Sequence, residues 1–135
     1  MSPGRGGRGT DTEERARRHR LEGMCAALLE KKASDVTDID VAARSSVADR
    51  FVIASGGSRV AVQALADALR ERLATWGERP LRIEGYAEAR WVCVDCGDIV
   101  IHLFQHEVRR YFDLERLWGD APQRSWAPEA LAASV

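Results

Sequence analysis

The stretch "RFVIASGGSR", residues 50–59, sets the centre of the predicted fold because it joins a strand to a helix. Residues 51–54 are an uninterrupted apolar run, as expected of a strand that is covered on both faces. Gly56 and Gly57 stop this strand, and Ser58 can cap the helix that follows. Strand, glycine turn and helix in this order predict the start of a β-α-β unit.

The chain after Ser58 predicts one long helix, three strands and a short helix. The long helix spans residues 59–76 and ends at Gly77. The strands are residues 80–85, where Pro80 favours an outer position in the sheet, and the two apolar runs that flank Cys96 and Gly97. The short helix follows in "HEVRRYFDLERLW", residues 106–118. The buried stripe of the long helix consists of Val62, Leu65, Leu69 and Leu73.

The chain before residue 50 adds a helix and a strand. A helix capped at Asp11 or Thr12 runs to about Ala33, and residues 36–41 alternate as a strand does. The whole pattern predicts an α/β protein of α+β-like character, with a mixed sheet of about five strands covered by helices. We expect a single domain at 13–122, a flexible tail at 1–12 and a C-terminal tail at 123–135.

Composition narrows the class of protein. The 135 residues suit one domain, and 45% hydrophobic with 30% charged residues is typical of a globular chain. The net charge of -1 gives no overall basic footprint, so we expect no specific nucleic acid as a partner. No apolar run reaches the ~18 residues of a membrane helix, and no signal-peptide core opens the chain. We therefore expect a cytoplasmic protein without a membrane partner.

The stretch "CVDCGDIVIHLFQH", residues 93–106, has the letter spacing of a zinc site. If Cys96 and Gly97 form a hairpin turn, however, Cys93 lies inside a regular strand. Cys93 is then about 10 Å along the strand from Cys96, whereas a Zn–S bond is only ~2.3 Å. We therefore expect no metal site and no cofactor.

The same hairpin register divides its residues between two faces. Val92, Val94 and their neighbours across the hairpin form a uniformly apolar face, which predicts core. The opposite face carries Trp91, and it is either covered by a helix or exposed as a docking surface. This register also places Asp95 opposite Asp98, and paired carboxylates can hold magnesium. A magnesium-dependent, nucleotidyltransferase-like enzyme that uses Asp95 and Asp98 is therefore the alternative function, although no P-loop is present.

Arginines between residues 15 and 20 fall outside the buried stripe of the first helix. They fit a solvated face, and a polyanionic partner could also use them. An RNA-binding module is thus a third possibility, which would show a steep salt dependence.

Three segments together resemble a known family. These are "ADRFVIASG" at 48–56, "EGYAEARWVCVDCGDIVIHLF" at 84–104 and "RRYFDLERLWGDAP" at 109–122. The chain in this part resembles the ribosomal silencing factor family, also called Iojap-like. The combination of "IASG", "EG" six residues before Trp91, "GDIVIH" and "LERLW" is specific to it.

The resemblance implies a binding protein rather than an enzyme. Family members bind ribosomal protein L-fourteen on the large subunit, block joining of the small subunit and so silence translation when nutrients are scarce. The resemblance also implies a fold with nucleotidyltransferase-like topology and a homodimer when the protein is free. This chain departs from the family at Phe112, where a tyrosine is usual, so that the hydroxyl has moved to Tyr111 or been lost, and at Arg50, where the family usually has an apolar or small residue.

A docking surface of this kind needs aromatic anchors and a charged rim. We expect the anchors to be Trp91, Tyr111, Phe112 and Trp118, and the rim to be Arg109, Arg110, Asp113 and Glu115.

Overall fold

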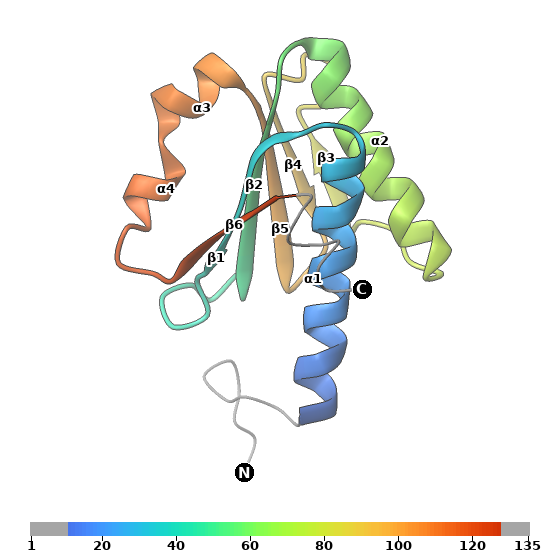
Figure 1. Ribbon diagram of the computed structural model, residues 1–135, viewed down its shortest axis with the longest axis vertical. Helices are drawn as coiled ribbons and strands as arrows, with labels where there is room; N and C mark the ends of the chain where they lie inside the picture. Colours follow the sequence, from blue (N-terminus) through green and yellow to red (C-terminus); the bar gives the residue numbers. More distant parts are fainter. Residues whose placement is uncertain (1–10, 128–135) are drawn as a thin grey trace.

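A computed structural model describes residues 11–127 and contains one mixed sheet flanked by helices (Figure 1). The sheet order is β3-β4-β5-β2-β1-β6. Strands β2 and β5 are parallel, and every other neighbouring pair is antiparallel. The elements are α1 (Asp11–Glu30), β1 (Ser34–Asp40), β2 (Arg50–Gly56), α2 (Arg59–Thr75), β3 (Arg82–Glu84), β4 (Trp91–Asp95), β5 (Ile99–Gln105), α3 (His106–Phe112), α4 (Leu114–Leu117) and β6 (Gln123–Trp126).

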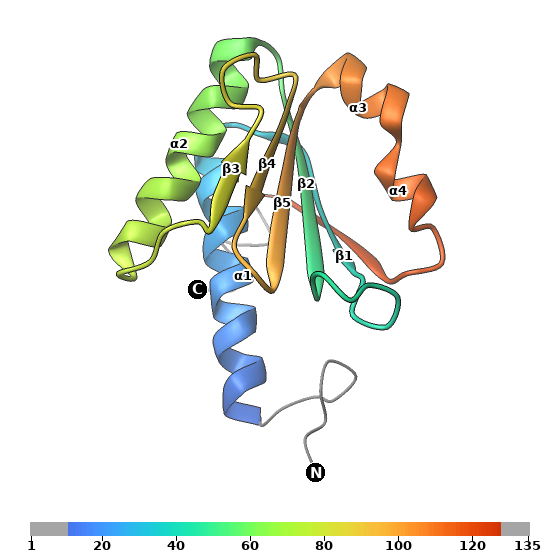
Figure 2. The same cartoon turned by 180° about the vertical axis from the view of Figure 1, so that it is seen from behind.

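Two long helices cover one face of this sheet, and two short helices cover the other. Figures 1 and 2 show α1 and α2 on one side and the short α3 and α4 on the other. The larger apolar core lies under α1 and α2 and includes Met24, Leu28 and Leu69. The smaller core lies on the α3 side and includes Ile53 and Phe104. The predicted mixed α/β class is confirmed, with six strands in place of about five.

The junction between β2 and α2 forms as the sequence predicts. Residues 52–56 of β2 are buried, and β2 lies between β1 and β5 in the middle of the sheet. The Ser58 side chain caps α2 by accepting a hydrogen bond from the Ala61 backbone N–H at 3.0 Å. The four residues of the predicted stripe are at most 1% exposed. This junction sends the chain from the centre of the sheet onto its more heavily covered face.

Strand β6 lies where the sequence predicted a tail. Gln123–Trp126 pairs antiparallel with β1, so β1 is not an edge strand. The segment "QRSW" lacks the alternation of apolar residues that marks a strand, and side chains anchor it instead. Trp126 Nε1 donates a hydrogen bond to Asp38 at 2.6 Å, and Arg124 Nε donates to the same carboxylate at 3.2 Å. At the other end of the chain, α1 begins at Asp11, within the expected tail 1–12; residues 1–10 and 128–135 lie outside the described part.

The hairpin of β4 and β5 turns one residue later than predicted. Cys96 pairs with Ile99, so Gly97 and Asp98 form the two-residue loop, and Gly97 takes the positive φ of +89° that this loop requires. Trp91 therefore lies opposite Phe104, and Asp95 lies opposite Val100 rather than Asp98. The partner of each residue moves by two positions, an even number, so both predicted faces are retained.

The predicted helix over residues 106–118 is interrupted at Asp113. Asp113 adopts a left-handed conformation with φ of +50° and ends α3, and α4 starts at the next residue. Its N–H donates to the carbonyl of Arg109 at 2.8 Å, which completes the last turn of α3. Aspartate tolerates this conformation better than most residues. The break turns α4 away from the axis of α3 (Figure 2).

Candidate docking surface

Three aromatic side chains from β4 and α3 form one partly exposed cluster. The ring centroids of Trp91 and Phe112 are 4.7 Å apart, and those of Phe112 and Tyr111 are 5.1 Å apart. Tyr111 is 82% exposed and Phe112 46% exposed, whereas Trp91 is half-buried. We call Trp91, Tyr111 and Phe112 the aromatic surface. The structure thus brings together three of the four predicted anchors.

The sheet beneath fixes the position of Trp91. Its ring packs on Phe104 at 5.0 Å between centroids, and its Nε1–H donates to His102 Nδ1 at 3.1 Å. Because His102 Nδ1 accepts this proton, its Nε2 carries the hydrogen of the neutral ring. Nε2 is buried and has no partner among residues 11–127. Burial also lowers the pKa of His102 to about 4, so the imidazole stays neutral and remains an acceptor for Trp91 at physiological pH.

His102 should make the stability of the protein dependent on pH. The unfolded chain takes up its proton near pH 6.5, whereas the folded chain does so only near pH 4. Acidification across that window therefore favours unfolding, by up to about 3 kcal/mol from this one group. We expect urea melts from pH 7 to pH 4 to show this loss in the wild type and a smaller loss in His102→Phe. The matched variant His106→Phe, at an exposed position, should follow the wild type; equal pH profiles for all three proteins would contradict the assignment.

Gly85 allows the loop before β4 to pass close to Trp91. Its φ is +82°, and a Cβ at this position would lie 2.3 Å from the backbone carbonyl oxygen of Trp91. Only glycine avoids both the strained conformation and the clash. We expect Gly85→Ala to lower the free energy of unfolding by about 2 kcal/mol. Gly77→Ala is the matched control, because Gly77 also has a positive φ, +72°, but a Cβ added there would have no neighbouring atom within 4 Å. Denaturant melts in which both variants lose equal stability would show that the contact with Trp91 is unimportant.

Arg109 was expected on the charged rim, but the structure buries it. It is 8% exposed, and its Nη1 donates to Ser55 Oγ at 2.8 Å. Its Nε and Nη2 both donate to Glu115, at 3.1 and 2.6 Å. Arg109 therefore joins α3 to β2 and to α4, across the break at Asp113. Arg109 is thus a buried link between these elements, whereas Glu115, which accepts two of its hydrogen bonds, is half-buried.

Trp118, the fourth predicted anchor, packs inward. Its ring meets Phe51 edge-on at 5.4 Å, and the guanidinium of Arg44 lies 5.5 Å from its centre. It belongs to the smaller core and is only partly exposed. Arg110 is exposed beside Tyr111, and Asp113 is half-buried at the break between α3 and α4. These two residues remain available as the rim.

Leu117 is an exposed apolar residue that the sequence analysis did not assign to the site. It is 68% exposed on α4, although its spacing from Leu114 is compatible with a buried stripe. Only Leu114 packs on the smaller core. Leu117 is exposed because the helix is interrupted at Asp113, and the interruption changes the direction in which the following side chains point. Such a change is visible only once the break is known.

The two cysteines of the possible zinc site lie apart and are protonated at neutral pH. Cys93 packs toward the smaller core and Cys96 toward the larger one, on opposite faces of the sheet. Burial raises the pKa of both thiols, that of Cys96 to about 12, so neither is a thiolate at neutral pH. Within residues 11–127, no group of three or more histidine, cysteine or acidic side chains is placed to hold a metal ion.

The two aspartates of the enzymatic alternative are occupied by separate arginines. Asp95 accepts from Arg82 at 3.3 Å and from the Gly97 N–H at 2.9 Å. Asp98 accepts from Arg20 at 2.9 Å and lies 3.8 Å from Arg17. Each carboxylate is therefore compensated by its own arginine.

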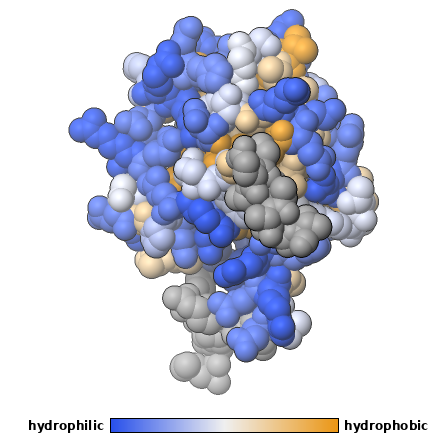
Figure 3. Space-filling view, viewed as in Figure 1, coloured by the Kyte–Doolittle hydropathy of each residue, from blue (hydrophilic) through white to orange (hydrophobic). Residues whose placement is uncertain are grey.

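The helices described between residues 11 and 127 are too short or too polar to cross a membrane. The face turned to the viewer in Figure 3 is mostly hydrophilic, with small scattered apolar areas.

Comparison with known proteins gives one consistent result. Residues 13–134 match the model of a family described as "Ribosomal silencing factor during starvation". The chain is 44% identical over 102 residues to the ribosomal silencing factor RsfS of Bacillus subtilis, covering 76% of this chain and 86% of that one. The RsfS of Halalkalibacterium halodurans is 44% identical over 96 residues, covering 71% and 82%. A crystal structure of a Chromobacterium violaceum protein superposes with a TM-score of 0.73 at 33% identity, covering 76% of this chain and 85% of that one.

Proposed function

The chain belongs to the ribosomal silencing factor (RsfS) family, and we propose that it silences translation by docking its aromatic surface on the large ribosomal subunit. Its function is that of the family, ribosome silencing during starvation, and it acts as a regulator rather than as an enzyme. We place this action in the cytoplasm, where ribosomal subunits join.

The observation that carries the docking proposal is the exposure of two adjacent rings on a rigid support. Tyrosine and tryptophan dominate binding hot spots because they bury a large area at a small cost in conformational entropy. Here Trp91 is already held by His102, and Phe112 rests against it, so little order has to be gained on binding. Arg110 and Asp113 supply charges of both signs at the edge. This composition fits a protein partner.

We propose ribosomal protein L-fourteen as that partner, as the family resemblance implies. A chain of 135 residues has a radius of gyration of about 14 Å, so it would keep apart two subunit surfaces that must come into contact. Steric exclusion then explains silencing without any chemical step. Phe112 replaces the family's usual tyrosine, and its ring contact with Trp91 keeps the apolar part of that side chain.

Subunit joining tests the proposal. Purified large and small subunits are mixed with the chain, and association is followed by light scattering. We expect the chain to reduce joining when it is added to large subunits first. Purified L-fourteen should capture the chain in a pull-down. Unchanged joining at saturating chain would refute silencing by exclusion, whereas silencing without capture by L-fourteen would refute only the choice of partner.

We also propose that the free chain self-associates through the same part of its surface. Tyr111, Phe112 and Leu117 expose apolar groups that a second copy could cover. Sedimentation velocity over a concentration series should show a monomer–dimer equilibrium that Phe112→Ala weakens. A dimer unaffected by this substitution would place the contact elsewhere.

The nucleotidyltransferase-like topology that the resemblance implies fits a mixed sheet with a parallel central pair. We propose that the chain retains such a scaffold without its chemistry, because Asp95 and Asp98 are bound to different arginines.

A further inference from the structure

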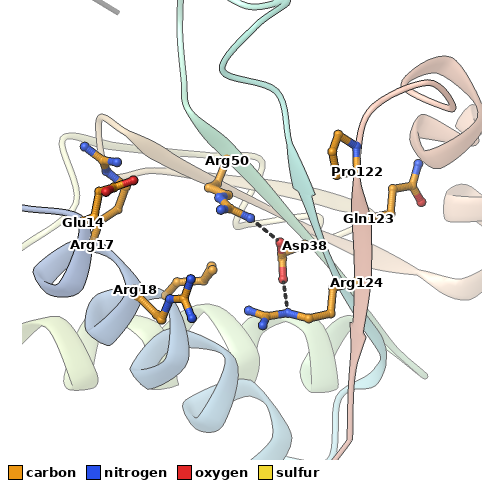
Figure 4. A pocket seen from close by; sticks show the side chains of 9 residues that line it. Glu14, Arg17, Arg18, Asp38, Arg50, Pro122, Gln123 and Arg124 are labelled. Atoms are coloured by element: carbon orange, nitrogen blue, oxygen red, sulfur yellow. Dashed lines mark hydrogen bonds and ion pairs between the residues drawn. The ribbon is translucent and has the colours of Figure 1, made fainter. Parts of the chain in front are cut away.

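A hollow of about 230 Å³ lies between α1 and strands β1, β2 and β6 (Figure 4). It is on the α1 side of the sheet, whereas α3, which carries Tyr111 and Phe112, covers the other side (Figure 1). Four arginines contribute to its wall, namely Arg17, Arg18, Arg50 and Arg124. Figure 4 shows the guanidinium groups of Arg18, Arg50 and Arg124 turned toward the same space. We propose that this hollow binds a phosphoryl group. The proposal is independent of the docking function.

Asp38 holds two of these arginines in place. It is 1% exposed and accepts three hydrogen bonds, from Arg50 at 2.9 Å, from Arg124 Nε at 3.2 Å and from Trp126 at 2.6 Å. The guanidinium of Arg124 also lies 4.1 Å from the centre of the Trp126 ring. A buried carboxylate and an aromatic face therefore pre-orient two cations that arrive from different strands. This arrangement also gives Arg50, which departs from the family pattern, a structural role.

The arginines keep donors that the protein does not use. Arg124 donates a hydrogen bond through Nε alone, to Asp38. Its two terminal nitrogens have no acceptor among residues 11–127. The guanidinium of Arg18 makes no hydrogen bond or ion pair with any residue between 11 and 127. Arg50 directs one nitrogen at Asp38 and lies 3.8 Å from Asp40 through another. Arg17 is the arginine least available to a ligand, because it lies 4.0 Å from Asp49 and 3.8 Å from Asp98.

The charge of the lining favours an anion. Four arginines and two carboxylates, Glu14 and Asp38, line the hollow and give its lining a formal balance of 4 − 2 = +2. Asp40, Asp49 and Asp98 approach Arg50 and Arg17 from outside the lining, so Arg18 and Arg124 supply the positive charge that is available to an anion. Asp38 is shared between Arg50 and Arg124 and so cannot neutralise both. An anion in the hollow would relieve the repulsion between guanidinium groups that face one another. Glu14 stands at the wall and would oppose the anion, which limits the expected affinity.

The geometry suits a phosphoryl group better than a carboxylate. Arginine forks from a helix and two strands approach from different directions, as the oxygens of a tetrahedral anion require, whereas a planar carboxylate presents two oxygens in one plane. The hollow is also smaller than the ~300 Å³ at which pockets begin to enclose whole drug-sized ligands. It therefore fits a single phosphoryl group with the rest of the molecule outside. That group could belong to a free phosphate compound or to an RNA backbone.

Titration with defined probes tests the proposal. Arginine Nε resonances of the full chain are followed by NMR at low salt as inorganic phosphate, adenosine monophosphate, a single-stranded RNA oligomer or acetate is added. We expect saturable shifts at Arg18, Arg50 and Arg124 with a phosphate Kd on the order of 1 mM. Arg18→Gln should weaken binding about tenfold by removing one charged donor. Arg79→Gln, at an exposed position away from the hollow, should bind like the wild type.

The probes also separate the two sources of the group. Binding of phosphate or the mononucleotide that depends on Arg18 indicates a free phosphate compound. Binding of the RNA oligomer alone, equally dependent on Arg18 and weakened by salt, indicates an RNA backbone. The proposal is overturned if no probe gives saturable shifts, if acetate binds as tightly as phosphate, or if Arg18→Gln and Arg79→Gln bind alike.

Discussion

Replacing Arg109 with alanine is expected to lower the free energy of unfolding by about 3 kcal/mol, the lower end of the scale observed when one partner of a buried ion pair is removed. The lower end applies because the Glu115 side chain is 29% exposed and water can solvate part of it. The substitution takes three donors from the interior and leaves Ser55 Oγ and the Glu115 carboxylate without them. It also cuts the connection between β2, α3 and α4. Urea denaturation followed by circular dichroism measures the loss.

Arg110→Ala is the matched control, because Arg110 is the next residue of α3 and is exposed. It should change the free energy of unfolding by less than about 0.5 kcal/mol. A loss in Arg109→Ala no greater than in Arg110→Ala would contradict the supporting role of Arg109. A second variant, Glu115→Gln, keeps the size of the partner and should lose less stability than Arg109→Ala.

Removing both exposed rings of the aromatic surface is expected to weaken binding to the large subunit about 100-fold or more. Truncation of a single aromatic hot-spot residue costs about 2 kcal/mol, and two adjacent residues need not add fully. Tyr111→Ala with Phe112→Ala removes side chains that are 82% and 46% exposed, so the fold should tolerate the change. Anisotropy titration of labelled chain with purified large subunits gives the Kd.

Two exposed apolar residues elsewhere provide the control for this double variant. Val60 on α2 and Leu81 before β3 are 67% and 75% exposed and lie outside the aromatic surface. The variant Val60→Ala with Leu81→Ala should bind like the wild type. An equal loss of affinity in both double variants would mean that general hydrophobicity, not this surface, drives association.

Trp91→Ala answers a different question from the double variant. Trp91 is half-buried and packs on Phe104 and Phe112, so its removal perturbs the sheet as well as the surface. A loss of binding in this variant could therefore come from a loss of folded protein, so its free energy of unfolding must be measured as well. His102→Phe is more informative, since it removes the acceptor for the indole N–H while it keeps a ring in place.

The sequence predicted those parts of the fold that local chemistry determines. The apolar run of β2, the cap at Ser58 and the stripe of α2 are each encoded by residues a few positions apart, and all three are confirmed. The two faces of the β4–β5 hairpin are confirmed as well, despite the shifted turn. Alternation alone decides the faces, whereas the loop position depends on which residue adopts a positive φ.

The parts that were missed depend on contacts distant in sequence. Strand β6 is anchored by Asp38, which lies 86 and 88 positions from Arg124 and Trp126. The burial of Arg109 depends on Ser55, 54 positions away, and no local pattern distinguishes Arg109 from the exposed Arg110. The inward position of Trp118 likewise depends on Phe51. Amino-acid type singled out the region of the proposed docking surface, and tertiary contacts decided which of its side chains face outward.

Hydrogen exchange of the chain bound to isolated large subunits tests the central claim most directly. If the aromatic surface is the docking site, amides of α3 and α4, residues 106–117, should exchange more slowly in the complex than in the free chain. Amides of α1 and α2, on the opposite face of the sheet, should be unchanged (Figure 1). Protection of α1 and α2 with unchanged exchange in α3 and α4 would contradict the account.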